Sequence, residues 1–199
     1  MKKLENNPKP HYKSIRLKGF DYTQAGAYFV TICTYKWVSL FGNIIDGEMV
    51  LNNLGKIVKD EIIKTSEIRD IIDIDKYVIM PNHVHLIIII NEGSRTARRA
   101  ATIEHYGKPV ANSIPTIIRS FKSAITRSIH LILGKNDQII WQRNYYEHII
   151  RNEHELNKIR RYIFNNPPKW EYDQENRNGL PIDEKKKFWT KFLNEFDYD

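Results

Sequence analysis

The 199-residue sequence has one cysteine, Cys33, and no long hydrophobic run. A single cysteine excludes an internal disulfide framework and any cysteine-based zinc finger. The longest apolar run, Leu86 to Ile90 behind Val84, is far shorter than the ~18 residues that a membrane-spanning helix needs. Residues Met1 to Ser14 contain no apolar stretch, so no secretory signal is visible. We therefore expect a soluble, cytoplasmic protein that does not contact a membrane.

Acidic residues are the minority among the charged ones. Asp and Glu number 24 against 31 Lys and Arg, which gives a net charge of +7. Such a balance favours polyanionic partners such as nucleic acids. Hydrophobic residues make up 41% and charged residues 28%, the mixture of an ordinary globular protein, and the length fits one domain.

Several segments are rich in β-branched and aromatic residues, and they predict strands. The Asp46-Gly47 pair between apolar residues predicts a hairpin, and Pro81-Asn82 predicts a turn between two further strands. The predicted strands are Ala27 to Tyr35, Asn43 to Ile45, Glu48 to Leu51, Asp75 to Met80 and His83 to Ile90.

Apolar residues at helical spacing predict helices over Asn53 to Arg69, Ile114 to Leu133 and Glu153 to Asn165. Asn152 with Glu155 three residues later resembles a capping box at the start of the third helix. Strands joined by short turns, with helices kept to one face, indicate an α+β fold rather than a doubly wound parallel sheet. The polar stretch Glu92 to Asn112 is either a mobile basic loop or a solvated connector.

The segment His83-Val84-His85 is the first candidate site. Residues two apart on a strand point to the same face, so both imidazoles project side by side and can bind one divalent metal ion. The alternative is a pair of surface histidines that bind no metal. The apolar run that follows places this strand at the centre of the sheet, where unpartnered polar groups are costly, and that favours a metal site.

Tyr162 and Asn166 form the second candidate. Four residues apart on a helix, they lie on nearly the same side, one turn apart. Tyr162 is a potential nucleophile, and the carbonyl oxygen of Asn166 could reach a metal ion. Alternatively, Tyr162 is a half-buried aromatic residue and Asn166 a C-terminal cap.

A third candidate runs from Trp141 to His148 and mixes aromatic, cationic and hydrogen-bonding side chains, as nucleic-acid surfaces do. Tyr145 and Tyr146 are rival nucleophiles on chemistry alone, and His148 is a rival metal ligand or general base. The alternative is the polar edge of a loop with buried aromatic residues.

In combination these segments resemble the REP-associated tyrosine transposases, a branch of the single-tyrosine HUH transposases. The likeness covers roughly Ser14 to Trp170 and leaves a tail, 171–199, of unclear role that could pack as a short amphipathic helix. The matching stretches are Ser14 to Tyr22, Gly26 to Thr34, Met80 to His85, Ile117 to Lys122, Trp141 to Arg151 and Arg161 to Pro167.

The resemblance implies a ferredoxin-like antiparallel sheet with the helices packed on one face, His83 and His85 on a central strand, and Tyr162 as the nucleophile. Related insertion-sequence transposases have a glutamine four residues after the tyrosine as the third metal ligand. In this sequence that position is occupied by Asn166. Enzymes of this family cut single-stranded DNA near hairpins, here repetitive extragenic palindromes, and hold the 5′ phosphate on the tyrosine. Both monomeric and dimeric relatives occur, and the sequence does not decide between them.

The chemistry of the residues is compatible with that activity. A phenol of pKa ~10 is a poor nucleophile at neutral pH, so a divalent ion on His83, His85 and Asn166 would have to polarise the phosphate. These proposed ligands are all neutral. Two imidazoles suit Mn²⁺, and Zn²⁺ is also compatible with them. Mg²⁺ prefers oxygen ligands and would be coordinated largely by water and DNA oxygens.

Basic residues along the chain are candidate phosphate contacts that would make DNA binding salt-dependent. Two other functions remain open: a non-catalytic, domesticated DNA-hairpin-binding module, and a histidine-ligated metal hydrolase that uses water. The candidate DNA-binding residues are Arg95, Arg98, Arg99, Arg119, Lys122, Arg143, Arg160 and Arg161.

Overall fold

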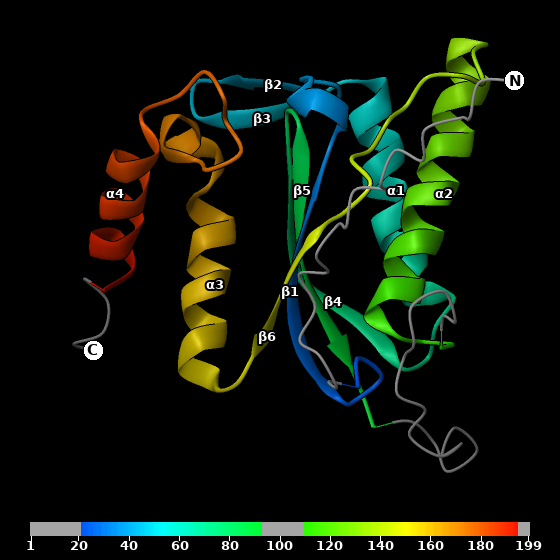
Figure 1. Ribbon diagram of the computed structural model, residues 1–199, viewed down its shortest axis with the longest axis horizontal. Helices are drawn as coiled ribbons and strands as arrows, with labels where there is room; N and C mark the ends of the chain where they lie inside the picture. The colour runs from blue at the N-terminus through cyan, green and yellow to red at the C-terminus, as the bar shows by residue number, and fades with distance from the viewer. Residues whose placement is uncertain (1–20, 93–109, 195–199) are drawn as a thin grey trace, which may run out of the picture.

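A four-stranded antiparallel sheet lies at the centre of the structure, with the strand order β4-β5-β1-β6 (Figure 1). The computed structural model describes residues 21–92 and 110–194. The elements of the sheet and its helices are β1 (Gly26–Cys33), α1 (Asn53–Glu67), β4 (Ile72–Met80), β5 (His83–Ile90), α2 (Ile114–Leu133), β6 (Tyr146–Ile150) and α3 (Glu153–Asn165). The expected α+β fold with an antiparallel sheet is confirmed, and the β-α-β-β-α-β order is that of a ferredoxin-like fold.

Shorter elements surround this unit. The Asp46-Gly47 turn joins β2 (Gly42–Ile45) to β3 (Glu48–Leu51), as the sequence predicts. The 3-10 helices η1 (Tyr35–Trp37) and η3 (Pro167–Tyr172) follow β1 and α3, and α4 (Ile182–Asn194) is the last described helix. The sequence-based expectation that the tail could form an amphipathic helix is therefore confirmed by α4.

The prediction that the helices pack on one face of the sheet is wrong. In Figure 1, α1 and α2 lie on one side of the sheet and α3 lies on the other. The larger core joins α1 and α2 to side chains such as Val84 and Leu86, whereas α3 packs Leu156 and Ile163 against Ile87. The reason is that β5 is apolar on both faces, so each face needs a cover.

Some element boundaries also differ from the prediction; β4, for example, begins at Ile72 rather than at Asp75. The strand expected to reach Tyr35 ends at Cys33, because Thr34 makes only an isolated bridge to Trp141 and the backbone then turns through η1. The candidate nucleic-acid segment Trp141 to His148, for which a polar loop edge is the alternative, runs into β6, which pairs with β1. Alternation of polar and apolar residues in β6 is too short to stand out from the sequence.

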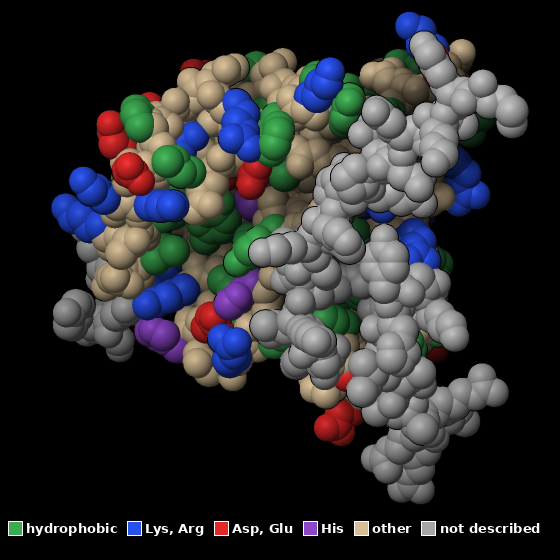
Figure 2. Space-filling model, viewed as in Figure 1, with side chains coloured by type: hydrophobic (Ala, Val, Ile, Leu, Met, Phe, Trp, Pro, Cys, Tyr) green, Lys and Arg blue, Asp and Glu red, His purple; other side chains and the backbone are tan. Residues whose placement is uncertain are grey.

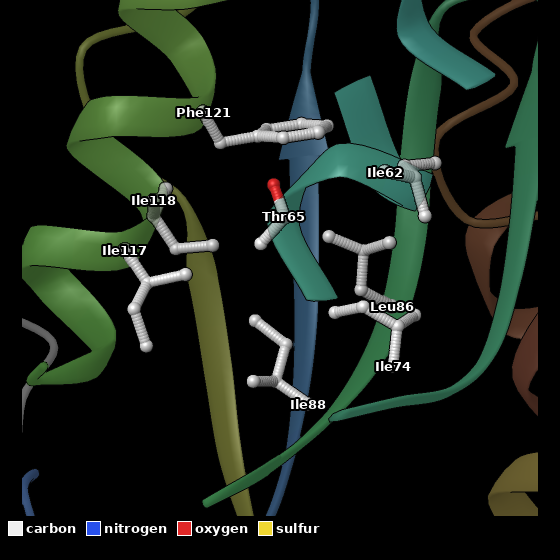
Figure 3. A pocket seen from close by; sticks show the side chains of 8 residues that line it. All are labelled: Ile62, Thr65, Ile74, Leu86, Ile88, Ile117, Ile118 and Phe121. Carbon is white, nitrogen blue, oxygen red and sulfur yellow. The ribbon is translucent and has the colours of Figure 1, made fainter. Parts of the chain in front are cut away.

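The core between α1, α2 and the sheet contains a cavity of about 10 Å³, drawn in Figure 3. Its lining is apolar apart from Thr65, whose hydroxyl donates to the carbonyl of Glu61 over 2.8 Å. A cavity of that size and polarity holds no ligand and hardly one water. The lining residues are Ile62, Thr65, Ile74, Leu86, Ile88, Ile117, Ile118 and Phe121.

Within the described ranges, 21–92 and 110–194, none of the helices has the length and the apolar character needed to cross a membrane.

Candidate metal and tyrosine site

The two histidines stand where the sequence places them, at the start of β5 and on its α3 face. In the sheet register, His83 is opposite Cys33 and His85 is opposite Thr31 of β1. Their side chains are buried, with 0% and 2% of their surfaces exposed. The two Nε2 atoms lie 2.9 Å apart. Two nitrogens bound at right angles to one ion, each about 2.1 Å from it, would lie ~3 Å apart, so this spacing suits a shared metal ion.

Each histidine has a second, fixed hydrogen bond on its other ring nitrogen. Nδ1 of His83 lies 2.8 Å from the side-chain oxygen of Asn82, and Nδ1 of His85 lies 2.8 Å from the hydroxyl of Thr31. Partners of this kind orient a metal-binding imidazole and are part of most histidine metal sites.

Tyr162 and Asn166 reach the same place from the end of α3. The hydroxyl of Tyr162 lies 3.2 Å from Nε2 of His85. Asn166, the C-cap of α3, is 0% exposed, and its side-chain oxygen has no hydrogen-bond partner among residues 21–92 and 110–194. A buried acceptor without a partner is costly, which makes this oxygen available to a cation or a water molecule.

Asp173 is the member of the cluster that the sequence analysis missed. Its Oδ2 accepts hydrogen bonds from the Tyr162 hydroxyl at 3.0 Å and from Nδ2 of Asn166 at 2.6 Å. The same oxygen lies 3.8 Å from Nε2 of His83 and 3.6 Å from Nε2 of His85. The tail beyond Trp170, outside the stretch of family resemblance, therefore contributes a carboxylate to the site.

Little in the sequence marks Asp173. It lies among other charged residues of the tail, such as Glu171 and Glu175, and a carboxylate there is most simply explained as solvent-exposed. The one available signal is Pro167-Pro168, which ends α3 and turns the chain back. The structure places Asp173 after η3, with its backbone N–H bonded to the carbonyl of Trp170 and its Oδ1 accepting from the N–H of Glu175 at 2.7 Å.

Burial and the nearby charges shift the pKa values of these groups. Burial lowers the pKa of His83 to about 3, against an opposing effect of the Asp173 charge. Burial raises the pKa of Asp173, but His83, His85 and the hydrogen bond from Asn166 outweigh it, so this carboxyl group stays ionised. The pKa of Tyr162 is raised well above 10, first by burial and then by the charge of Asp173. The proton between Tyr162 and Asp173 therefore stays on the phenol.

His83, His85 and Asp173 together could hold a metal ion. One ligand atom from each lies within 4.8 Å of the others, and all three residues are buried. Two imidazoles and a carboxylate are ligands that suit Mn²⁺, Fe²⁺ or Zn²⁺. The expectation of an all-neutral ligand set is therefore incomplete, because a charged carboxylate lies among the proposed ligands.

Aromatic rings from η3, α4 and the sheet itself pack around the site. Trp170 of η3 stacks on His83 at 6.0 Å between ring centroids, and Trp189 of α4 meets Tyr162 edge-on at 4.6 Å. Phe29 of β1 stacks on His85 at 5.2 Å. The cluster is closed to a molecule as large as a DNA backbone in this conformation.

The rival residues of the sequence analysis lie elsewhere. His148 of β6 pairs with Glu155 in the first turn of α3, with 2.6 Å between Nε2 and Oε1. This contact ties His148 to the start of α3. Tyr145 packs against the larger core. Tyr146 is 53% exposed, and its ring contacts Phe29 rather than either histidine of the cluster.

The predicted DNA-binding residues are not all placed alike. Arg95, Arg98 and Arg99 lie outside the described residues, as does most of the stretch from Glu92 to Asn112. Arg160 and Lys122 make hydrogen bonds within the protein. The guanidinium of Arg160 binds Asp75 and Glu153, and Nζ of Lys122 donates to the carbonyl oxygens of Gln142 and Arg143.

The remaining cations differ in exposure: Arg119 and Arg143 are exposed, and Arg161 is partly buried. In Figure 2, Lys and Arg side chains are spread over the visible face with Asp and Glu among them. These residues stay predictions as DNA contacts.

Comparisons with known proteins give one clear relative and a shared fold. The chain is 42% identical over 172 residues to an uncharacterized protein of Haemophilus influenzae, a match that covers 82% of this chain and 92% of that protein. No protein-family model matches the sequence.

Among solved structures, a REP-associated tyrosine transposase bound to a REP hairpin superposes with a TM-score of 0.52 and 23% identity, over 81% of this chain and 74% of the other. A candidate transposase of Deinococcus radiodurans R1 gives a TM-score of 0.42 and 19% identity, over 75% and 97% of the two chains. The expected resemblance is confirmed at the level of the fold.

Proposed function

We propose that this chain, which belongs to the same family as the Haemophilus influenzae protein and has the fold of a REP-associated tyrosine transposase, is a transposase-type enzyme. Its reaction in this proposal is metal-dependent cleavage and strand transfer of single-stranded DNA at hairpin sequences. The structural neighbour is described as bound to a REP hairpin, and that supports hairpin DNA as the substrate class.

The observation that carries the proposal is the contact of Tyr162 with the histidine pair. A tyrosine hydroxyl 3.2 Å from Nε2 of His85, in a cluster that could hold a metal ion, brings a nucleophile and an electrophile-polarising site together. A protein that only binds DNA needs neither.

In the proposed reaction the oxygen of Tyr162 attacks a backbone phosphorus and forms a bond to it. The bond from that phosphorus to the 3′ oxygen breaks, which leaves a 5′-phosphotyrosine and a free 3′ hydroxyl after that oxygen takes up a proton. The phenol proton is released to water as this bond forms, while Asp173, whose pKa is lowered, stays ionised and orients the phenol through its hydrogen bond at 3.0 Å. Because the phosphodiester energy is kept in the new ester, the strand can be rejoined without ATP.

A divalent ion, Mn²⁺ or Mg²⁺, would supply neutralisation of the charge that develops on the phosphate. His83, His85 and Asp173 would hold it, and the oxygen of Asn166, which has no hydrogen-bond partner in the described part of the chain, would be a further ligand. In this proposal Asn166 is a metal ligand, as the sequence resemblance implies, and the carboxylate of Asp173 is an additional one.

Access requires a movement of the tail. With His83, His85 and Asp173 at 0–2% exposure beneath η3 and α4, a phosphate reaches Tyr162 only when this cover shifts. Of the candidate phosphate contacts, Arg161 adjoins Tyr162 on α3 and would contact the backbone near the cut, whereas Arg119 belongs to α2 on the opposite face of the sheet.

The experiment is a denaturing gel of labelled single-stranded hairpin DNA incubated with Mn²⁺, Mg²⁺ or chelator. We expect a metal-dependent covalent protein–DNA adduct that Tyr162→Phe abolishes and Tyr146→Phe retains, with DNA binding of both variants near wild type. Cleavage without an adduct would instead indicate a water-using hydrolase. Hairpin binding with no cleavage under any condition would indicate a non-catalytic module.

A further inference from the structure

The side chain of Asn82 fixes which nitrogen of His83 carries a proton. Its Nδ2 donates to two backbone carbonyls, those of Trp37 at 3.3 Å and Glu175 at 2.9 Å. The amide oxygen must therefore face Nδ1 of His83, 2.8 Å away. An amide oxygen only accepts hydrogen bonds, so Nδ1 of His83 carries the hydrogen and Nε2 presents its lone pair to the cluster.

The state of His85 follows from that of His83. The two Nε2 atoms are 2.9 Å apart, and since His83 offers only a lone pair there, the hydrogen between them belongs to Nε2 of His85. Nδ1 of His85 then has a lone pair, which accepts from the hydroxyl of Thr31 at 2.8 Å. The metal-free cluster is a chain of hydrogen bonds that runs from Thr31 through both rings to Asn82.

A metal ion shared by both Nε2 atoms needs a different arrangement at only one of the two rings. His83 already presents a lone pair, whereas Nε2 of His85 must give up its hydrogen. The neutral ring then carries that hydrogen at Nδ1, by exchange with solvent, and its charge is unchanged. Nδ1 becomes a donor, so its buried partner must become an acceptor. A hydroxyl can do both, because it has one hydrogen and two lone pairs.

From this geometry we propose that Thr31 is a positioning residue for metal binding: its hydroxyl reverses the direction of its hydrogen bond to His85 when the ion enters. The proposal rests on the metal site of the proposed function. Thr31 is 4% exposed and lies opposite His85 in the β1–β5 register, so bulk water does not substitute for the hydroxyl. The amide oxygen of Asn82 can only accept a hydrogen bond from Nδ1 of His83. Nε2 of His83 therefore keeps its lone pair, and His83 can act as the first ligand without rearrangement.

The first test is the ring ¹⁵N NMR spectrum of the wild-type protein, with and without Zn²⁺ as a diamagnetic probe, assigned with a His85→Gln variant. Without metal we expect the hydrogen of His83 on Nδ1 and that of His85 on Nε2. With Zn²⁺ we expect both on Nδ1. A metal-free spectrum that already shows the hydrogen of His85 on Nδ1 would overturn the proposal.

The second test compares two substitutions by Mn²⁺ titration, followed by electron paramagnetic resonance. Thr31→Val keeps the β-branched shape but removes the hydroxyl, and we expect Mn²⁺ affinity to fall roughly 10–100-fold, as for other partners of metal-bound histidines. Thr31→Ser restores the hydroxyl and should restore the affinity to within a few fold. Equal affinities of the Val and Ser variants, each with a wild-type thermal unfolding midpoint, would contradict a positioning role.

The outcomes separate this inference from the proposed function. If the wild-type histidine resonances do not respond to Zn²⁺ and Mn²⁺ does not bind, the metal site itself is wrong. If the metals bind at His83 and His85 but Thr31→Val binds them as tightly as wild type does, only the inference about Thr31 is wrong. Neither readout requires DNA cleavage.

Discussion

The hydroxyl of Tyr162 donates a hydrogen bond to Oδ2 of Asp173 over 3.0 Å and so joins the end of α3 to the segment after η3. The same carboxylate oxygen accepts from Asn166 and lies within 4 Å of both site histidines. Asp173 is therefore placed to influence the phenol, the imidazoles and any ion between them.

Asp173→Asn should lower the pKa of Tyr162 in the metal-free protein. The carboxylate raises this pKa by its charge and by its hydrogen bond to the neutral phenol, and the amide removes the charge. Burial, the largest cause, remains, so the value should stay above 10. We would follow the Tyr162 ring by ¹³C NMR over an alkaline pH series, assigned with Tyr162→Phe. Asp183→Asn, in the first turn of α4, is the control. An unchanged or higher pKa would contradict the argument.

Replacing His83 and His85 together by Ala should abolish specific Mn²⁺ binding and metal-dependent DNA cleavage. Both side chains face the proposed ion, and Asp173 and Asn166 without them offer too few ligands to hold it. Isothermal titration with Mn²⁺ measures the first effect and the denaturing gel the second. His148→Ala is the matched control, because His148 pairs with Glu155 outside the cluster. Undiminished binding by the double variant would place the metal elsewhere.

Asp75→Asn should lower the free energy of unfolding by about 1 kcal/mol at pH 7, as expected for a partly buried charge-assisted pair. Asp75 sits at a register shift between β4 and β5, and both of its oxygens accept from Arg160 of α3 at 2.8 Å. The urea unfolding curve measures the change. Glu153→Gln, whose carboxylate also binds Arg160 but is 71% exposed, should cost much less.

The same pair predicts a pH dependence. The hydrogen bonds from Arg160 hold the pKa of Asp75 below its ordinary value of 3.8. The pair therefore contributes its full stability above the unfolded-state pKa, ~3.9, and loses it as the pH falls through the lower folded-state value. The difference between wild type and Asp75→Asn should shrink as the pH is lowered from 5 towards 2. A difference that grows on acidification would refute the ion-pair explanation.

Trp189→Ala should loosen the cover of the site without unfolding the sheet. Trp189 is 4% exposed, packs against Tyr162 and donates its indole N–H to the carbonyl of Tyr172 at 2.9 Å. Removing such a buried ring costs about 3–5 kcal/mol at the site of the contact. Amide hydrogen exchange in α4 and η3 should accelerate, while β1 and β5 stay protected. Leu131→Ala, at an 84% exposed position, is the control. Unchanged exchange in α4 would show that Trp189 does not hold the cover.

The sequence alone determined those secondary-structure elements and candidate residues that depend on a local pattern. The Asp46-Gly47 hairpin, the bounds of β5 and α2, and the Asn152 cap, which accepts from the N–H of Glu155 at 2.8 Å, all agree with prediction. The common face of His83 and His85 also follows from the two-residue period of a strand. These features depend on neighbours within a few residues along the chain.

Only the tertiary structure decided which helix covers which face of the sheet, and that Asp173 reaches the cluster. A carboxylate among the other charged residues of the tail belongs to no periodic apolar pattern that would predict its burial. Its position depends on the turn after Pro167-Pro168, on the docking of Trp170 over His83 and on the hydrogen bonds from Tyr162 and Asn166. Such contacts join residues that are remote in sequence. They stabilise the protein only after folding has ordered the residues that make them, so a local sequence pattern does not predict them.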